Sequence, residues 1–267
     1  MKPHFPVLSV AGGLLLDLVV PDSGPRFVAA FSTRVALEPS GPAFINYGFS
    51  GDIPGAASAR SRLCHALGLE VENFTCGEQV HGVRAVFVDE KTAGAGGRDP
   101  DSRVPETDAL FTDAPGVPLA VCTADCVPVL ISDGKTGAVA AVHAGWRGAV
   151  GGIVEKTIEE MGARCGADAG EMTVYTGPSI GSCCFEIQQD VAGLLEGADA
   201  GCIERRGGSM FLDLRRLVAL RVEAAGVPPE RIHVRPACTS CNTHMYYSYR
   251  GDRRVRGSNI SLIARLD

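Results

Sequence analysis

A strand–turn–strand pattern near the middle of the chain constrains the fold more than any other feature. Residues 127–132 are apolar and rich in β-branched side chains, residues 133–137 read Asp-Gly-Lys-Thr-Gly, and residues 138–143 are apolar again. Two such runs separated by a short polar segment with glycine are typical of a β-hairpin. We therefore predict an antiparallel hairpin here.

The register of this hairpin decides whether two reactive side chains meet. With a four-residue loop at 133–136, Ser132 pairs with Gly137, and Cys126 falls opposite His143. Directly opposed side chains share a face, with Cβ atoms about 5 Å apart. A change of one residue in the register would place them on opposite faces, so the shared site depends on it.

The remaining periodic segments predict mixed β-sheets with flanking helices, because strands outnumber helices and do not alternate with them regularly. Aspartates at 52 and 213 stand where helix N-caps belong, and glycines at 68 and 226 where helices should end. Further strands are expected at Leu14–Val20, Phe27–Phe31, Val83–Val88, Ala109–Thr112, Leu119–Thr123, Met172–Thr176 and Ile232–Arg235. Helices are expected at Pro54–Leu67, Gly151–Met161, Glu186–Leu195 and Leu214–Ala225.

Charge and cysteine content limit the partners and the compartment. The 267 residues have a net charge of −6, and no Lys/Arg run is longer than two, which disfavours nucleic acid and anionic membranes as the main partner. No segment is long enough to cross a bilayer. Ten cysteines in a long chain with an ordinary core favour free thiols in a reducing cytoplasm over a disulfide framework.

His81, Cys126 and His143 are the candidate metal ligands. Two imidazoles and one thiolate suit Zn²⁺, or less often Cu²⁺, and three protein ligands would leave a fourth position for water or substrate. The thiol and one imidazole could instead form a Cys–His nucleophile pair. In the simplest interpretation, His81 and His143 are buried or surface histidines without a metal, and Cys126 is a thiol of the hydrophobic core.

The segment after His143 is a candidate anion site. Residues 144–148 read Ala-Gly-Trp-Arg-Gly and lead toward a predicted helix, so free backbone N–H groups and Arg147 could bind phosphate or carboxylate. Arg147 could equally be a surface arginine. Asp125, directly before the thiol, could orient a ligand or move a proton, or simply form a turn.

Cys238 and Cys241 form a Cys-x-x-Cys pair. A zinc knuckle would need more ligands nearby, and no thioredoxin-like βαβ unit surrounds the pair, so a structural role is the favoured interpretation.

Nine short segments, in order along nearly the whole chain, resemble the multicopper polyphenol oxidase or laccase-domain family (YfiH-like), whose members are described as purine nucleoside enzymes. They are Phe31-Ser-Thr-Arg34, Gln79-Val-His-Gly82, Thr107-Asp-Ala-Leu110, Ala124-Asp-Cys126, His143-Ala-Gly-Trp-Arg-Gly148, Gly177-Pro-Ser-Ile-Gly181 with Cys183-Cys-Phe-Glu186, and Cys238-Thr239 with Ser248-Tyr-Arg250.

The resemblance implies a single compact α/β domain over residues 1–267, with layered mixed β-sheets and a zinc site at the three residues above. It implies phosphorolysis of adenosine, inosine, guanosine and methylthioadenosine, and deamination of adenosine; copper-dependent phenol oxidation is also described in the family. Purine nucleosides and phosphate are thus the expected partners of a monomer or small homo-oligomer. We expect substrate contacts from Arg34, Asn46 and Arg147.

The chain departs from the family pattern in three places. Ala59-Arg60 stands where an Asn-Arg pair is usual, residues 35–39 replace a glycine-rich stretch, and Gly257-Ser258 replaces Gly-Arg. These departures bear on the preferred nucleoside rather than on the metal site.

Three other functions compete with this one: a copper oxidase, a metal-free hydrolase and a nucleoside or metal sensor. A four-copper laccase is disfavoured, because the six histidines include no His-x-His pair. A metal-free hydrolase would use Cys126 as nucleophile and His143 as base. The nucleobase-deaminase zinc signature is missing, so adenosine deamination would need another site design. A nucleoside or metal sensor would bind without turnover.

Overall fold

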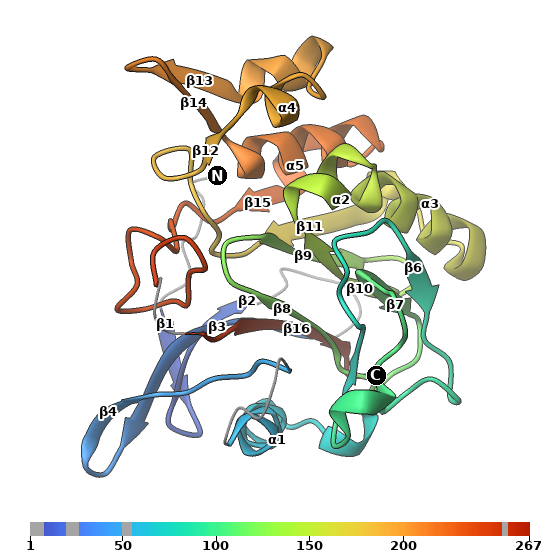
Figure 1. Cartoon of the computed structure of the whole chain (residues 1–267). Coiled ribbons are helices and arrows are strands. Elements are labelled where there is room, and N and C mark those ends of the chain that lie inside the picture. Colours follow the sequence, from blue (N-terminus) through green and yellow to red (C-terminus); the bar gives the residue numbers. More distant parts are fainter. Residues whose placement is uncertain (1–7, 20–26, 50–54, 253–255) are drawn as a thin grey trace.

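Two β-sheets stacked face to face form the centre of the protein, and helices cover their outer faces (Figure 1). The computed structural model describes residues 8–19, 27–49, 55–252 and 256–267. The layered α/β domain with mixed sheets is the predicted fold class, which is confirmed.

The first sheet has seven strands within the described residues, in the order β1-β2-β3-β16-β8-β5, with β4 paired to β3. Neighbouring strands are antiparallel, except that β5 is parallel to β8. The strands are β1 (Leu8–Ala11), β2 (Leu14–Val19), β3 (Phe27–Glu38), β4 (Gly41–Phe44), β5 (Thr75–Cys76), β8 (Leu119–Thr123) and β16 (Asn259–Arg265).

Over the described part of the chain, the second sheet has six strands in the order β15-β11-β9-β10-β7-β6. A small third sheet has the order β12-β14-β13. In the second sheet, the two edge strands β6 and β15 run parallel to their neighbours, and the other strand pairs are antiparallel. The strands are β6 (Ala85–Phe87), β7 (Ala109–Thr112), β9 (Val127–Asp133), β10 (Val139–Ala144), β11 (Met172–Thr176), β15 (Ile232–Val234), β12 (Glu186–Ile187), β13 (Ile203–Arg206) and β14 (Ser209–Leu212).

Helices cover the two outer faces. Helix α1 packs on the first sheet, and α2, α3 and α5 pack on the second. The α-helices are α1 (Ala56–Ala66), α2 (Trp146–Val150), α3 (Ile153–Cys165), α4 (Gln189–Ala192) and α5 (Leu214–Ala224), and 3₁₀ turns lie at Val71–Asn73, Pro100–Ser102, Ala169–Glu171, Gly197–Cys202 and Pro229–Arg231. None of the helices in the described part of the chain has the length and apolar character of a membrane span.

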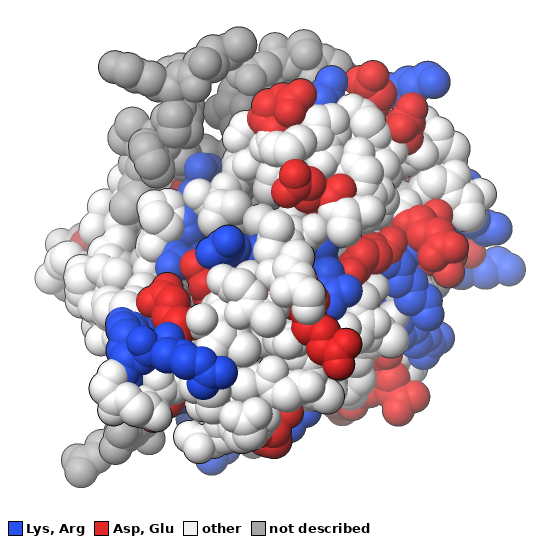
Figure 2. Space-filling view, turned by 90° about the horizontal axis from the view of Figure 1, so that it is seen from above, with Lys and Arg blue, Asp and Glu red and all other residues white. Residues whose placement is uncertain are grey.

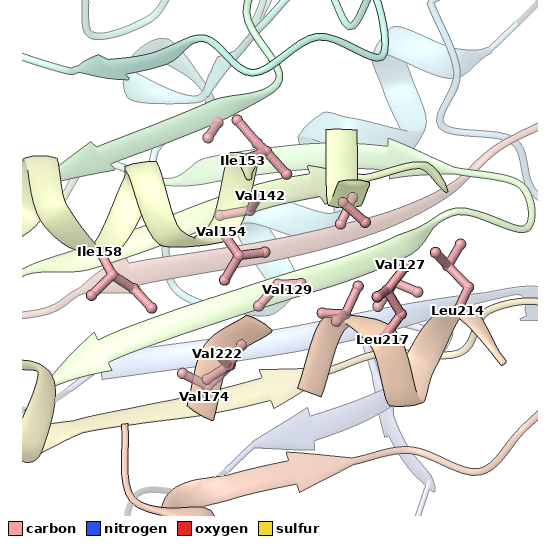
Figure 3. Close-up of a cluster of buried hydrophobic side chains, with 14 of the residues drawn as sticks. Val127, Val129, Val142, Ile153, Val154, Ile158, Val174, Leu214, Leu217 and Val222 are labelled. Carbon is pink, nitrogen blue, oxygen red and sulfur yellow. The ribbon is translucent and has the colours of Figure 1, made fainter. Parts of the chain in front are cut away.

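Alternation along the central strands builds two cores. Val127, Val129 and Val142 point toward α3 and α5 (Figure 3), whereas Leu130 and Ala141 point between the two sheets. Burying each such aliphatic side chain stabilises the fold by about 1.5–3 kcal/mol.

On the face shown in Figure 2, basic and acidic side chains are interspersed.

The hairpin is confirmed, but its register is not the predicted one. Ser132 pairs with Val139, so His143 lies opposite Pro128 and not opposite Cys126. The loop begins one residue later than expected, because the Asp133 N–H donates to the Ala138 carbonyl and the Asp133 carboxylate accepts the N–H groups of the loop. The resulting shift of two residues preserves the face, so the thiol and the imidazole still lie on the same side of the sheet.

Three of the four predicted helices are confirmed, although their ends are shifted. The pattern at 151–161 is α3, which begins at Ile153, and α2 precedes it as a separate turn. The predicted helix at Glu186–Leu195 is wrong: its first two residues pair with β14, and only α4 is helical.

The helix-end signals are confirmed where they fall on described residues. The Asp213 carboxylate accepts the N–H of Arg216 at the start of α5. Gly68 and Gly226 follow α1 and α5 with φ of 71° and 99°. The proposed cap at position 52 lies outside the described residues.

Candidate metal centre

The structure brings His81, Cys126 and His143 together. One ligand atom from each residue lies within 4.8 Å of the others. The Cys126 sulfur is 3.7 Å from Nε2 of His81, and the two imidazole rings meet edge to face with centroids 4.8 Å apart. Three soft or borderline donors therefore face one common point.

Each of the three comes from a different element. His143 lies in β10, Cys126 directly precedes β9, and His81 lies in the loop between β5 and β6. Gln79 fixes that loop to the first sheet, because its amide accepts the N–H of Cys122 at 2.8 Å and donates to the Cys122 carbonyl at 2.7 Å.

Asp108 organises both histidines. Its Oδ1 is 2.7 Å from Nδ1 of His143, and its carboxylate also accepts the backbone N–H groups of Val80, His81 and Gly82 at 2.7–3.2 Å. A carboxylate on Nδ1 leaves Nε2 of His143 free as the ligand atom. Sequence reasoning gave this residue no role; its only signal was the Thr107-Asp-Ala-Leu110 motif.

His81 has a left-handed backbone, with φ of 62°. This conformation costs a non-glycine residue about 1–3 kcal/mol and persists only where its surroundings enforce it. The hydrogen bonds from residues 80–82 to Asp108 supply that constraint. His81 is thus held in place by its backbone.

Gly145 lets His81 and Cys126 approach one another. A Cβ atom at this position would lie 2.8 Å from Cδ2 of His81 and 3.2 Å from the Cys126 sulfur. Any larger residue would therefore push these two side chains away from the centre.

The electrostatics of the centre favour a charged thiolate–imidazolium pair. Burial acts to raise the pKa of the Cys126 thiol, but His143 and His81 outweigh it and lower the pKa to about 6. Burial acts to lower the pKa of His143, but the Cys126 thiolate and the Asp108 carboxylate raise it to about 9. Burial also opposes ionisation of Asp108, yet the His143 contact and the Gly82 N–H hold its pKa below the usual range.

The donor set fits a zinc ion. Two imidazole nitrogens and one thiolate are ligands that Zn²⁺ accepts, and a carboxylate behind one imidazole is the usual outer partner of such a ligand. With three protein ligands, a bound Zn²⁺ ion would have a fourth position available for water or substrate.

A cavity of about 1000 Å³ adjoins His81, Cys126 and His143. It holds two kinds of side chain that suit an anionic, ring-containing ligand. Aromatic faces come from Phe49, Trp146, Phe185 and Tyr249, and guanidinium groups come from Arg103, Arg147, Arg250 and Arg256. Arg147 is exposed in α2, and its guanidinium lies 4.3 Å above the Trp146 ring.

Asp125 lines the same cavity, but both of its carboxylate oxygens are engaged. Oδ1 accepts hydrogen bonds from the hydroxyls of Thr239 and Ser248, each at 2.6 Å, and Oδ2 accepts the Arg250 N–H at 2.7 Å. Its backbone is also left-handed, with φ of 94°. The residue directly before Cys126 therefore anchors the loop between β15 and β16.

Arg34 and Asn46 lie behind the cavity lining. The buried Arg34 guanidinium pairs with Asp252 at 2.7 Å and is sandwiched between the Phe44 and Tyr247 rings. The Asn46 amide accepts the N–H of Ser258 at 3.0 Å. Both side chains thus contact the loop between β15 and β16, whose residues 256–258 line the cavity.

Curated relatives align with most of the chain. It is 35% identical over 246 residues to the purine nucleoside phosphorylase YlmD of Geobacillus stearothermophilus, covering 89% of this chain and 90% of that protein. It is 36% identical to a purine nucleoside phosphorylase of Deinococcus radiodurans, covering 85% of each. It is 33% identical to the adenosine deaminase RL5 of an unknown prokaryotic organism, covering 72% and 75%.

Solved structures have the same architecture. The crystal structure of YlmD from Geobacillus stearothermophilus matches with a TM-score of 0.89 at 33% identity, covering 99% of this chain and 100% of that one. The Bacillus licheniformis protein YfiH matches with a TM-score of 0.83 at 28% identity, covering 90% and 93%. The family described as multi-copper polyphenol oxidoreductase laccase matches residues 29–266. The chain belongs to this multi-copper polyphenol oxidoreductase laccase family.

Proposed function

We propose that the protein is a zinc-dependent purine nucleoside phosphorylase with His81, Cys126 and His143 as the metal ligands. The observation that supports this most directly is the convergence of these ligand atoms, within 4.8 Å, on a cavity that also contains Arg147. The relatives named purine nucleoside phosphorylase support the substrate class.

A bound Zn²⁺ ion would supply Lewis-acid activation at its open position. The chain's own residues supply orientation. Asp108 fixes the tautomer of His143, and the backbone of residues 80–82 fixes the direction of His81. Gly145 keeps the ligands close to each other.

Arg147 is the proposed phosphate-binding residue. Its planar guanidinium can donate two parallel hydrogen bonds to a phosphate, and stacking over Trp146 holds that plane at the cavity wall. The aromatic side chains of the same cavity offer faces on which a purine ring can stack. Nucleoside and phosphate would thus meet beside the ligands.

Three other predicted residues have positioning roles in this proposal. Asp125 holds the loop that contains Ser248 and Arg250, because its carboxylate already accepts three hydrogen bonds. Arg34 and Asn46 support the wall formed by residues 256–258.

The test is product analysis with and without phosphate. Adenosine and inosine are incubated with the protein, and free base and ribose 1-phosphate are quantified. Metal removal should abolish turnover, and Zn²⁺ should restore it. Arg147→Ala should raise the phosphate concentration needed for half-maximal rate, whereas Arg98→Ala, at an exposed pair with Glu72, should not. Full activity after verified metal removal would contradict the zinc mechanism.

Additional measurements separate the alternatives. Phosphate-independent ammonia release from adenosine would identify a deaminase, the activity for which the relative RL5 is named. Oxygen uptake with a phenol and Cu²⁺ would identify an oxidase, the activity in the family's name. Turnover that survives chelation but is lost on alkylation of Cys126 would identify the Cys–His hydrolase.

We place the reaction in the cytoplasm, because a reducing compartment suits ten free cysteines.

A further inference from the structure

Four cysteines from two loops converge at a second point. Cys183 and Cys184 lie between β11 and β12, and Cys238 and Cys241 lie between β15 and β16. Their four sulfur atoms lie within 4.8 Å of one another, and all four thiols are free. The Cys-x-x-Cys pair that seemed to lack further ligands in the sequence thus gains two from a distant loop.

The spacing of the sulfurs suits a shared ion. The Cys241 sulfur lies 3.4 Å from that of Cys184 and 3.6 Å from that of Cys183. Four thiolates around Zn²⁺, at Zn–S distances of about 2.3 Å, have sulfurs about 3.8 Å apart. A disulfide would bring two of them to about 2.05 Å. We propose that Cys183, Cys184, Cys238 and Cys241 form a tetrathiolate site for a thiophilic divalent cation such as Zn²⁺.

The backbone around the sulfurs is arranged for this role. The Gly181 N–H donates to the Cys238 sulfur at 3.2 Å, as an outer partner of a metal thiolate does. The Asn242 N–H and side-chain amide both donate to the Cys238 carbonyl and close the turn that brings Cys241 back toward Cys238. Ser179 and Cys238 form a bridge between the two loops.

Two arginines contact the loop that contains Cys183 and Cys184. Four thiolates and one divalent cation leave a net charge of −2, which nearby guanidinium groups stabilise. Arg206 donates to the Ser182 carbonyl. Arg215 packs so closely on Gly181 that a Cβ there would lie 2.6 Å from its guanidinium.

The site would stabilise the wall of the cavity. Four protein ligands leave no open position, which is the arrangement of a structural ion. Each joined loop contributes to the cavity lining, Ile180 and Phe185 from one and Ser248–Arg250 from the other. Thr239, next to Cys238, donates to Asp125, the neighbour of Cys126. The site does not depend on the proposed activity.

Metal analysis of the whole chain tests this inference. Protein purified anaerobically with reductant is loaded with Zn²⁺, desalted and analysed for metal. We expect about two ions per chain in the parent and about one in Cys184→Ser and Cys241→Ser, because serine is a poor zinc ligand. The control Cys165→Ser, outside both clusters, should keep about two.

Cobalt spectroscopy identifies which site is filled. In a His81→Ala, His143→Ala chain, added Co²⁺ should give the intense thiolate charge-transfer band of a tetrahedral tetrathiolate, and adding Cys241→Ser should abolish it. Cys241 is exposed, and circular dichroism verifies that each variant is folded. Unchanged metal content in Cys184→Ser and Cys241→Ser, or disulfides among the four cysteines in the anaerobic parent, would overturn the proposal.

Discussion

Asp108, directly before β7, makes two contacts with His143 of β10: its carboxylate contacts Nδ1 of His143 at 2.7 Å, and its carbonyl accepts the His143 N–H at 2.8 Å. The same carboxylate fixes the loop that contains His81. One acidic residue therefore sets the position of two candidate ligands from separate elements.

Asp108→Asn should weaken zinc binding by about 10- to 100-fold, the usual effect of losing an outer carboxylate. In one amide orientation the new NH₂ would face the N–H groups of Val80 and Gly82. In the other it would face the His81 N–H and could donate to Nδ1 of His143, which favours the tautomer with a proton on Nε2. Zinc affinity by competition with a chelating dye measures the effect. Asp113→Asn, at an exposed position, is the control, and equal affinities in the two variants would contradict this role.

Cys126 in metal-free protein should be alkylated at neutral pH. Its pKa is lowered from 9.0 to about 6, so the reactive thiolate persists above pH 6 and is lost as the pH falls through that value. Cys165 is the internal control, because burial raises its pKa to about 11. Peptide mass spectrometry after iodoacetamide treatment at a series of pH values gives both profiles. A midpoint for Cys126 near 9 would contradict the thiolate–imidazolium pair.

Gly145→Ala should reduce zinc affinity with little effect on secondary structure. The backbone at Gly145 has φ of −69°, which alanine adopts readily, so the effect comes from the clash with His81 and Cys126. Gly134→Ala is the matched control, because the nearest atom to its Cβ would be 3.9 Å away. Calorimetric zinc titration compares the two variants. Equal zinc affinities would show that His81 and Cys126 can move apart without weakening zinc binding.

Asp125→Asn should lower the free energy of unfolding by about 1–3 kcal/mol, because hydroxyl and N–H donors would lose their carboxylate acceptor. Asparagine tolerates a left-handed backbone, so the variant isolates the carboxylate. Urea denaturation gives the stability, and limited proteolysis reports on the loop at residues 237–252. Unchanged stability together with a large loss of turnover would favour the proton-carrier interpretation over the anchoring one.

Local patterns predicted the strands better than the site. The strands at 109–112, 119–123 and 172–176 have the predicted bounds, because apolar β-rich runs bounded by turn residues depend on little else. The segment Glu186–Leu195 failed as a helix because pairing of its first residues with β14 overrides its local preference. The hairpin loop was displaced by one residue because side-chain hydrogen bonds of Asp133 select the turn.

The candidate site was only partly predictable for a related reason. Cys126 and His143 are neighbours through one hairpin, which a sequence pattern can indicate. Asp108 reaches His143 through the pairing of β7 with β10, and Cys184 meets Cys241 across 57 residues of sequence. Neither contact has a local signature, and both follow from the assembled sheets.

The cross-strand position of Asp108 and His143 also bears on how the chain reaches its final structure. If β10 slipped by one residue along β7, the imidazole would turn to the opposite face and the three ligands would separate. A metal that binds them would therefore stabilise only correctly aligned chains and draw the folding equilibrium toward that alignment. Metal supply during synthesis would then favour the correct register of the central sheet. Its effect would appear as a higher yield of native protein.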